Sequence, residues 1–203
     1  MTKYKNPEGI RTMEKKRIFI TGIPTAGKSY LAKKLSEKVG GICVSIDDFR
    51  EDLTKDERYK KWVNFYLDQD EHIYYTTTTH EEQWANLVKQ SEGFWPGVLE
   101  KIHQYNKESR PIIFEGVNVL PHLAHKDLKM PGIAIIGRSF DETLERNKKD
   151  PRWGDTEELQ KLEAEAFFNG ERPHYKEESE KYGYQVFETP DEAYEAALSL
   201  LTK

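Results

Sequence analysis

The sequence has a single cysteine, Cys43, among its 203 residues, so an internal disulfide framework is excluded. No apolar run approaches the roughly 20 residues that a membrane-spanning helix needs. The longest run, at residues 133–137, has the length of a short strand. Lys3 and Lys5 near the amino terminus are not followed by the apolar core of a signal peptide. These absences favour a soluble protein of the reducing cytoplasm, without membrane contact.

Positive charge is not in excess either. Lysine and arginine together number 31 and aspartate and glutamate 36, which gives a formal net charge of −5. A mildly acidic chain is a poor candidate for general nucleic-acid binding, because such binding depends on neutralising phosphates. A small anionic ligand is not excluded, since it needs only a local positive site. The aromatic share of 12% argues against disorder.

Short apolar runs alternate with helical patterns along most of the chain. Residues 1–16 are polar and are expected to form an arm, and residues 17–203 to form one domain. We expect strands at 17–21, 42–46, 111–115, 132–136 and 185–188, and helices at 29–39, 98–106, 140–149, 156–168 and 191–201. This alternation predicts an α/β fold with a five-stranded parallel sheet and helices on both faces, a three-layer sandwich.

The long connection between the second and third strands, residues 50–108, is charged and rich in aromatic residues. It is expected to be a helical insert that is interrupted at Trp95-Pro96-Gly97. Cys43 lies in the middle of the second expected strand, so we expect its side chain to be buried.

The turn between the first strand and the first helix matches G-x-x-x-x-G-K-[ST] in full. Its residues are Gly22, Ile23, Pro24, Thr25, Ala26, Gly27, Lys28 and Ser29, and we assign the next residue, Tyr30, to the same site. The glycines let backbone N–H groups point at phosphate oxygens, and the helix offers its positive amino-terminal end. Lys28 is expected to reach the β- and γ-phosphates as a catalytic cation, and Ser29 to hold Mg²⁺. The motif predicts nucleotide binding, but ATPases, GTPases and metabolite kinases all use it.

Carboxylates follow the second and third strands. Ligands bind outside the carboxyl ends of parallel strands, which places Asp47 beside the γ-phosphate. Asp47 is expected to orient and deprotonate an attacking hydroxyl, or to bind Mg²⁺ through water. Arg50 can clamp an anionic acceptor, whereas Asp48 is expected to cap the next helix. Glu115-Gly116 follows the third strand, where the carboxylate can bind the acceptor or metal-bound water.

Three segments together resemble the P-loop kinases of small molecules. They are the phosphate loop, Ser45-Ile46-Asp47-Asp48-Phe49-Arg50, and Glu115-Gly116-Val117. Within that group the chain resembles the branch of 2-phosphoglycerate kinases and zeta-toxin-like kinases. The 2-phosphoglycerate kinase family carries histidine where this chain has Asn118. The resemblance implies a P-loop fold and an enzyme that uses ATP and Mg²⁺.

The resemblance also implies a basic lid after the fourth strand, here at about residues 146–175. Arg146 and Arg152 are the expected catalytic cations, because guanidinium groups fit phosphate. Arg172 is a second lid candidate. Thr189 and Pro190, which follow the fifth strand, correspond to the turn where similar kinases pass the adenine.

The sequence therefore predicts an ATP-dependent kinase that transfers the γ-phosphoryl group to a small acceptor, such as a phosphorylated or sugar-like metabolite. Three alternatives stay open: a nucleoside or nucleotide kinase, a zeta-toxin-like sugar-nucleotide kinase, and a regulator that binds ATP without transfer.

Overall fold

The computed structural model describes residues 16–202. The expected arm, residues 1–16, lies outside this range apart from Lys16. Among the described residues, no helix is both long and apolar enough to cross a bilayer.

A five-stranded parallel sheet forms the centre of the molecule, as the sequence predicts. Its strands are β1 (Arg17–Thr21), β2 (Ile42–Ser45), β3 (Ile112–Glu115), β4 (Gly132–Ile135) and β5 (Gln185–Phe187). Their order across the sheet is β2-β3-β1-β4-β5, and every neighbouring pair is parallel. The three central strands are almost wholly buried, because helices cover both faces of a parallel sheet.

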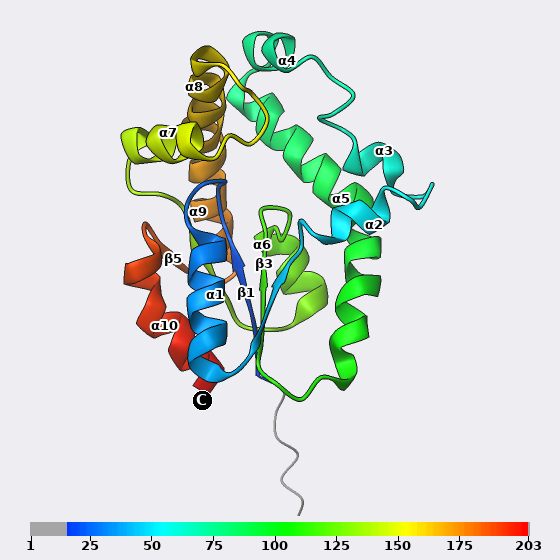
Figure 1. The fold of residues 1–203 in the computed structure, drawn as a ribbon, viewed down its shortest axis with the longest axis vertical. Helices are drawn as coiled ribbons and strands as arrows, with labels where there is room; N and C mark the ends of the chain where they lie inside the picture. Colours follow the sequence, from blue (N-terminus) through cyan, green and yellow to red (C-terminus); the bar gives the residue numbers. More distant parts are fainter. Residues whose placement is uncertain (1–15, 203) are drawn as a thin grey trace, which may run out of the picture.

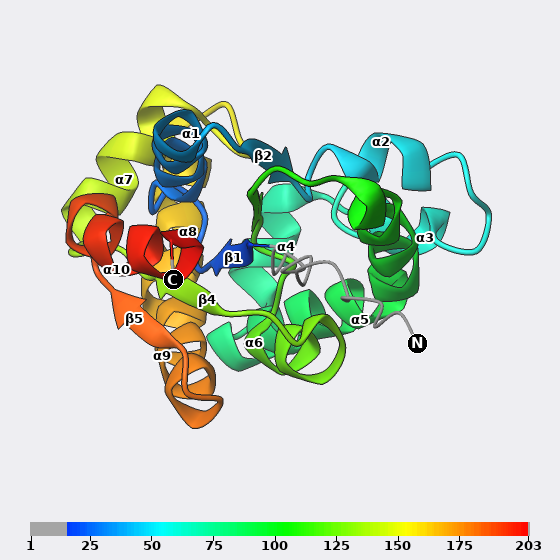
Figure 2. The same cartoon turned by 90° about the horizontal axis from the view of Figure 1, so that it is seen from below.

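Helices complete the three layers (Figures 1 and 2). On one face, α1 (Lys28–Val39) contacts β1, β2 and β3, and α10 (Pro190–Thr202) contacts β1, β4 and β5. On the other face lie α6 (Pro121–Leu123), followed by a π-helical segment η2 (Ala124–Leu128), and α9 (Arg172–Lys181). The α/β three-layer sandwich expected from the sequence is confirmed.

The helices between β2 and β3 lie to the right of the sheet in Figure 1, except that α4 and the start of α5 lie above it. In chain order these are α2 (Phe49–Leu53), α3 (Lys60–Val63), α4 (Glu71–Thr77), α5 (His80–Gln104) and a 3₁₀ turn, η1 (Tyr105–Lys107). The long helix α5 begins with a capping box. The Thr79 hydroxyl accepts from the Glu82 N–H, and the Glu82 carboxylate accepts from the Thr79 N–H.

The expected interruption at residues 95–97 is wrong, because α5 runs through Pro96 without a break. Pro96 faces solvent, where water can bond the carbonyl that lacks its helical donor. The neighbouring residues hold the helix in place. The Trp95 indole donates to Asp127 at 2.8 Å, and Gly97 packs so closely on Leu53 and Tyr59 that a Cβ there would force these side chains to move. Tertiary packing thus overrides the local preference of proline.

A further group of helices follows β4 in the chain. It consists of α7 (Phe140–Lys149), α8 (Glu157–Glu165) and a π-helical segment η3 (Ala166–Glu171) that leads directly into α9. The hydroxyl of Thr156 caps α8, as predicted, by accepting from the Leu159 N–H. The expected end at residue 168 is too early, because the chain stays helical to Lys181.

Cys43 is exposed, contrary to the expectation of a buried thiol. The reason is that β2 is an edge strand, and its burial is incomplete.

We predict that the phosphate-loop glycine Gly22 is required for folding. Its φ is +124°, and a Cβ there would lie 1.9 Å from the Ile135 carbonyl oxygen. Gly40 is the matched control, because its φ is +63° but a Cβ would meet no atom within 4 Å. Gly40→Ala should cost only the left-handed backbone penalty of about 1–2 kcal/mol. Gly22→Ala should cost at least about 2 kcal/mol more in urea unfolding, because backbone must also move. Equal losses in the two variants would contradict the proposed close approach.

Candidate active site

The phosphate loop holds Lys28 inward. Gly27, with φ +95°, ends the loop and begins α1. The Lys28 ammonium donates to the Ile23 carbonyl at 2.7 Å. Lys28 as a whole is only 7% exposed. Burial lowers the Lys28 pKa from 10.5 to about 8, although Glu115 and Asp47 oppose the shift. The carbonyl of the loop itself thus satisfies this cation, which makes no hydrogen bond to a carboxylate within residues 16–202.

A basic cavity of about 390 Å³ lies on the α7 side of the loop. Four of its lining residues are cationic and one is acidic. The full lining is Thr25, Gly27, Lys28, Ser29, Tyr30, Arg146, Lys149, Asp150 and Arg152. The Arg146 guanidinium donates to the Thr25 carbonyl at 3.2 Å, which ties α7 to the loop. Such a concentration of positive charge fits an anionic ligand of several phosphates.

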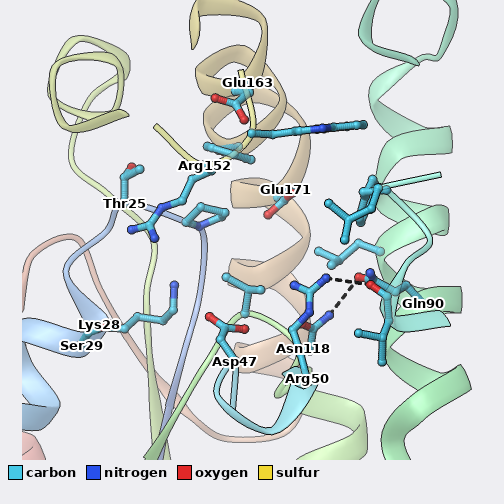
Figure 3. A pocket seen from close by; sticks show the side chains of 18 of the residues that line it. Thr25, Lys28, Ser29, Asp47, Arg50, Gln90, Asn118, Arg152, Glu163 and Glu171 are labelled. Atoms are coloured by element: carbon cyan, nitrogen blue, oxygen red, sulfur yellow. Dashed lines mark hydrogen bonds between the residues drawn. The ribbon is translucent and has the colours of Figure 1, made fainter. Parts of the chain in front are cut away.

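A larger cavity of about 560 Å³ lies on the other side of Lys28. This size is typical of sites that enclose a small molecule. Figure 3 shows Lys28 and Ser29 at one side and Gln90 at the opposite side, with Asp47 and Arg50 between them. The two cavities share Thr25, Lys28, Ser29 and Arg152.

Asp47 and Glu115 both line the larger cavity but differ in environment. Asp47 is exposed, whereas Glu115 is 3% exposed and burial raises its pKa, opposed by Lys28. Arg50 also lines the cavity, and its guanidinium donates to the Val63 carbonyl at 3.0 Å. Asp48 precedes α2 but accepts no capping hydrogen bond, so the expected cap is wrong.

Other residues expected at the site lie behind it. Gly22, Ile23, Ala26 and Gly116 are buried and line neither cavity. Thr189 caps α10 by accepting from the Glu192 N–H.

The turn expected on the adenine side, at Thr189 and Pro190, touches the phosphate loop without lining either cavity. A Cβ added at Gly27 would lie 2.5 Å from the Pro190 ring. Arg172, the second lid candidate, binds the Gly137 carbonyl and Glu188, and lines neither cavity.

Two carboxyl groups of the larger cavity were not found from the sequence. Glu163 is fully buried and accepts from the Asn147 amide at 2.7 Å. Glu171 ends the π-helical segment η3, and its Oε2 is buried without a hydrogen-bond partner in the described chain. Burial raises the Glu171 pKa from 4.5 to about 8, opposed by Lys28. No sequence signal marks a π-helical segment, although such segments often occur at functional sites.

Aromatic rings form another part of the wall. Tyr66 and Tyr75 line the cavity with Trp153, whose ring centre lies 5.8 and 5.9 Å from theirs. Phe167 lines the same space. The aromatic richness of residues 50–108 was the only signal for Tyr66 and Tyr75 in the sequence.

The donor set fits a magnesium ion. The Ser29 hydroxyl and the Asp47 carboxylate line the cavity together, with Glu115 beside them. Among residues 16–202 no cluster of three or more histidine, cysteine or acidic side chains could bind a metal ion alone. Mg²⁺ is usually held in this way, by one or two protein oxygens, phosphate oxygens and water.

Comparison with known proteins gives the fold. Neither a scan of protein-family models nor a search of curated protein sequences found a match. Among solved structures, TT1252 from Thermus thermophilus is similar with a TM-score of 0.58 and 19% identity, covering 93% of this chain and 99% of that one. Deoxyadenosine kinase from M. mycoides with bound dATP has a TM-score of 0.50 and 16% identity, over 92% of this chain and 100% of that one. At these identities the likeness establishes a shared α/β fold.

We predict that Glu171 makes stability fall as pH rises. Its carboxyl keeps a proton in the folded state up to about pH 8, whereas the unfolded chain releases it near pH 4.5. Between these values the folded state binds more protons, so stability declines with rising pH. Glu171→Gln should remove this decline, and the variant should gain on the order of 1–3 kcal/mol over wild type between pH 5 and pH 8.

The measurement is urea unfolding at a series of pH values. Glu177→Gln, at an exposed position of α9, serves as the control and should follow the wild-type profile. Parallel profiles for wild type and Glu171→Gln would mean that Glu171 is not held in its neutral form.

Proposed function

We propose that this protein is an ATP-dependent kinase that transfers the γ-phosphoryl group of ATP to a hydroxyl group of a small molecule. The observation that carries the proposal is the junction of two unlike cavities at Lys28, Ser29 and Arg152. The basic cavity suits the polyphosphate of ATP. The larger cavity has the size, the aromatic wall and the exposed Asp47 that an acceptor alcohol requires.

In the proposed step, the acceptor hydroxyl oxygen bonds to the γ-phosphorus of ATP. The bond from that phosphorus to the β–γ bridging oxygen breaks, and ADP leaves with its electron pair. The acceptor proton passes to Asp47. Lys28 and Arg152 stabilise the charge on the transferred group, because both face the junction of the cavities. Mg²⁺, when bound near Ser29 and Asp47, would supply further neutralisation of phosphate charge.

The charge of the larger cavity favours a neutral acceptor over a phosphorylated one. Its lining has three basic residues, Lys28, Arg50 and Arg152, and four carboxylates, Asp47, Glu51, Glu115 and Glu163, besides the carboxyl group of Glu171, which burial holds in its neutral form. Lys28 and Arg152 also line the basic cavity, and Arg50 is bonded to a carbonyl. On the acceptor side this leaves Arg50 alone for a second phosphate, with one of its N–H groups already donated to the Val63 carbonyl. This argues against 2-phosphoglycerate, although the sequence resembles that branch.

The large acceptor cavity also weighs against a regulator that only binds ATP. Regulation by ATP binding needs no enclosed space beyond the γ-phosphate, whereas transfer needs one from which water can be excluded. Arg146 and Arg152 retain the lid role expected for them, since both line the ATP side. We place the enzyme in the cytoplasm, where an exposed free thiol such as Cys43 stays reduced.

We predict that Asp47→Asn separates binding from transfer. The amide keeps the size of the side chain but accepts no proton, so the turnover number should fall by about 10²–10⁴-fold. The Kd for ATP, measured by calorimetry, should change little. Asp48→Asn is the matched control, because Asp48 is also exposed but lines neither cavity. Weaker ATP binding with an unchanged turnover number in Asp47→Asn would contradict the role of Asp47 as proton acceptor and leave it a binding role alone.

A further inference from the structure

Two buried amide side chains lie at the end of the larger cavity remote from the phosphate loop. Gln90 comes from the middle of α5, and Asn118 from the turn after β3. Each residue is 1% exposed, and both line the cavity. Figure 3 shows the hydrogen bond between them, and it shows Gln90 on the opposite side of the cavity from Lys28 and Ser29. Neither residue has a part in the phosphoryl-transfer step described above.

Hydrogen bonds fix the orientation of both amides. The Ser91 hydroxyl donates to the Leu87 carbonyl at 2.7 Å, so its oxygen accepts from Asn118 Nδ2 at 2.8 Å. The same Nδ2 donates to Gln90 Oε1 at 3.2 Å. Turning either amide over would bring two donors or two acceptors face to face.

This arrangement leaves one donor and one acceptor without partners. Gln90 Nε2 and Asn118 Oδ1 are buried and form no hydrogen bond with the described part of the chain. Buried amide groups are nearly always paired, because the loss of water is otherwise uncompensated. Since both residues line the cavity, a ligand that offers an acceptor and a donor on one edge would complete the network.

Flat heterocycles with a cyclic amide or amidine edge match this pattern. Adenine, guanine, cytosine and uracil all present an acceptor next to an N–H donor. A trans secondary amide, as in an N-acetyl sugar, points its C=O and N–H in opposite directions and cannot engage both. The wall includes Tyr66, Tyr75, Trp153 and Phe167, whose rings provide faces on which a flat base can stack.

We propose that the acceptor is a nucleoside, whose base is recognised by Gln90 and Asn118 and whose sugar hydroxyl lies at Asp47. The inference rests on the proposed kinase function and specifies its substrate class. A neutral nucleoside also agrees with a cavity in which Arg50 is the one basic lining residue that does not line the ATP side as well. The sugar oxygen bonds to the γ-phosphorus, ADP leaves, and the products are ADP and a nucleoside monophosphate.

The test is a transfer assay with ATP and MgCl₂ on the full chain. The acceptors are the four ribonucleosides, the four deoxyribonucleosides, glycerate, 2-phosphoglycerate, glucose and N-acetylglucosamine. At least one nucleoside should exceed every non-nucleoside in kcat/KM by about ten-fold or more. If that nucleoside is uridine or thymidine, its N3-methyl derivative should bind at least ten-fold more weakly in calorimetry, because the methyl group removes the N–H donor. For guanosine the N1-methyl derivative takes its place, and for adenosine or cytidine the derivative dimethylated on the exocyclic amine. This comparison needs no variant protein.

Gln90→Leu should lower kcat/KM for the best nucleoside by about 10²-fold, mainly through KM, because the variant keeps the catalytic groups. Gln83→Leu is the matched control, since Gln83 is a buried glutamine of the same helix that lines neither cavity. It should stay within about three-fold of wild type.

Three outcomes would overturn the inference. One is preferential transfer to a non-nucleoside acceptor, which would leave the kinase proposal intact. Another is nucleoside transfer that neither Gln90→Leu nor N-methylation weakens. The third is ATP binding without binding or transfer of any of the eight nucleosides. Failure to bind ATP at all would instead contradict the proposed function itself.

Discussion

The position of Lys28 is the constraint on which the site depends. Its ammonium group is almost wholly buried, and its one direct partner among the described residues is the Ile23 carbonyl. Burial of a cation without a carboxylate in contact is unfavourable, and this cost lowers the pKa of Lys28. A polyphosphate would relieve this cost by supplying negative charge. The fold thus keeps a cation ready at the point where the two cavities meet.

The rest of the fold brings the two cavities to that point. The crossover from β1 to α1 forms the loop, and the carboxyl ends of β2 and β3 deliver Asp47 and Glu115. Arg146 comes from α7, and Arg152 from the turn before α8. These cations serve the ATP side, whereas η3 supplies Phe167 and Glu171 to the acceptor side and α5 supplies Gln90. The two cavities differ in charge because different helices and turns supply their lining residues.

Local sequence patterns predicted the features that depend on short-range physics. The strands were recognisable because buried parallel strands are continuous apolar runs, and the phosphate loop because its spacing is specific. The predictions that are wrong concern features that depend on packing between segments far apart in the sequence. The helix α5 continues through Pro96 because Trp95 and Gly97 are fixed by other elements, and Cys43 is exposed because its strand is at an edge. Likewise, the positions of Glu171 and Gln90 in the larger cavity depend on a π-helical segment and on tertiary packing, for which the sequence has no marker.

The most direct measurement of the central claim is calorimetric titration of Lys28→Ala with ATP and MgCl₂, beside Lys33→Ala. Lys33 lies on the same helix but is exposed and lines neither cavity. If the junction at Lys28 binds the polyphosphate, Lys28→Ala should weaken ATP binding by at least about 100-fold, since charge-assisted contacts to phosphate are lost. Lys33→Ala should bind ATP as the wild type does. Equal and undiminished affinity in both variants would contradict the account.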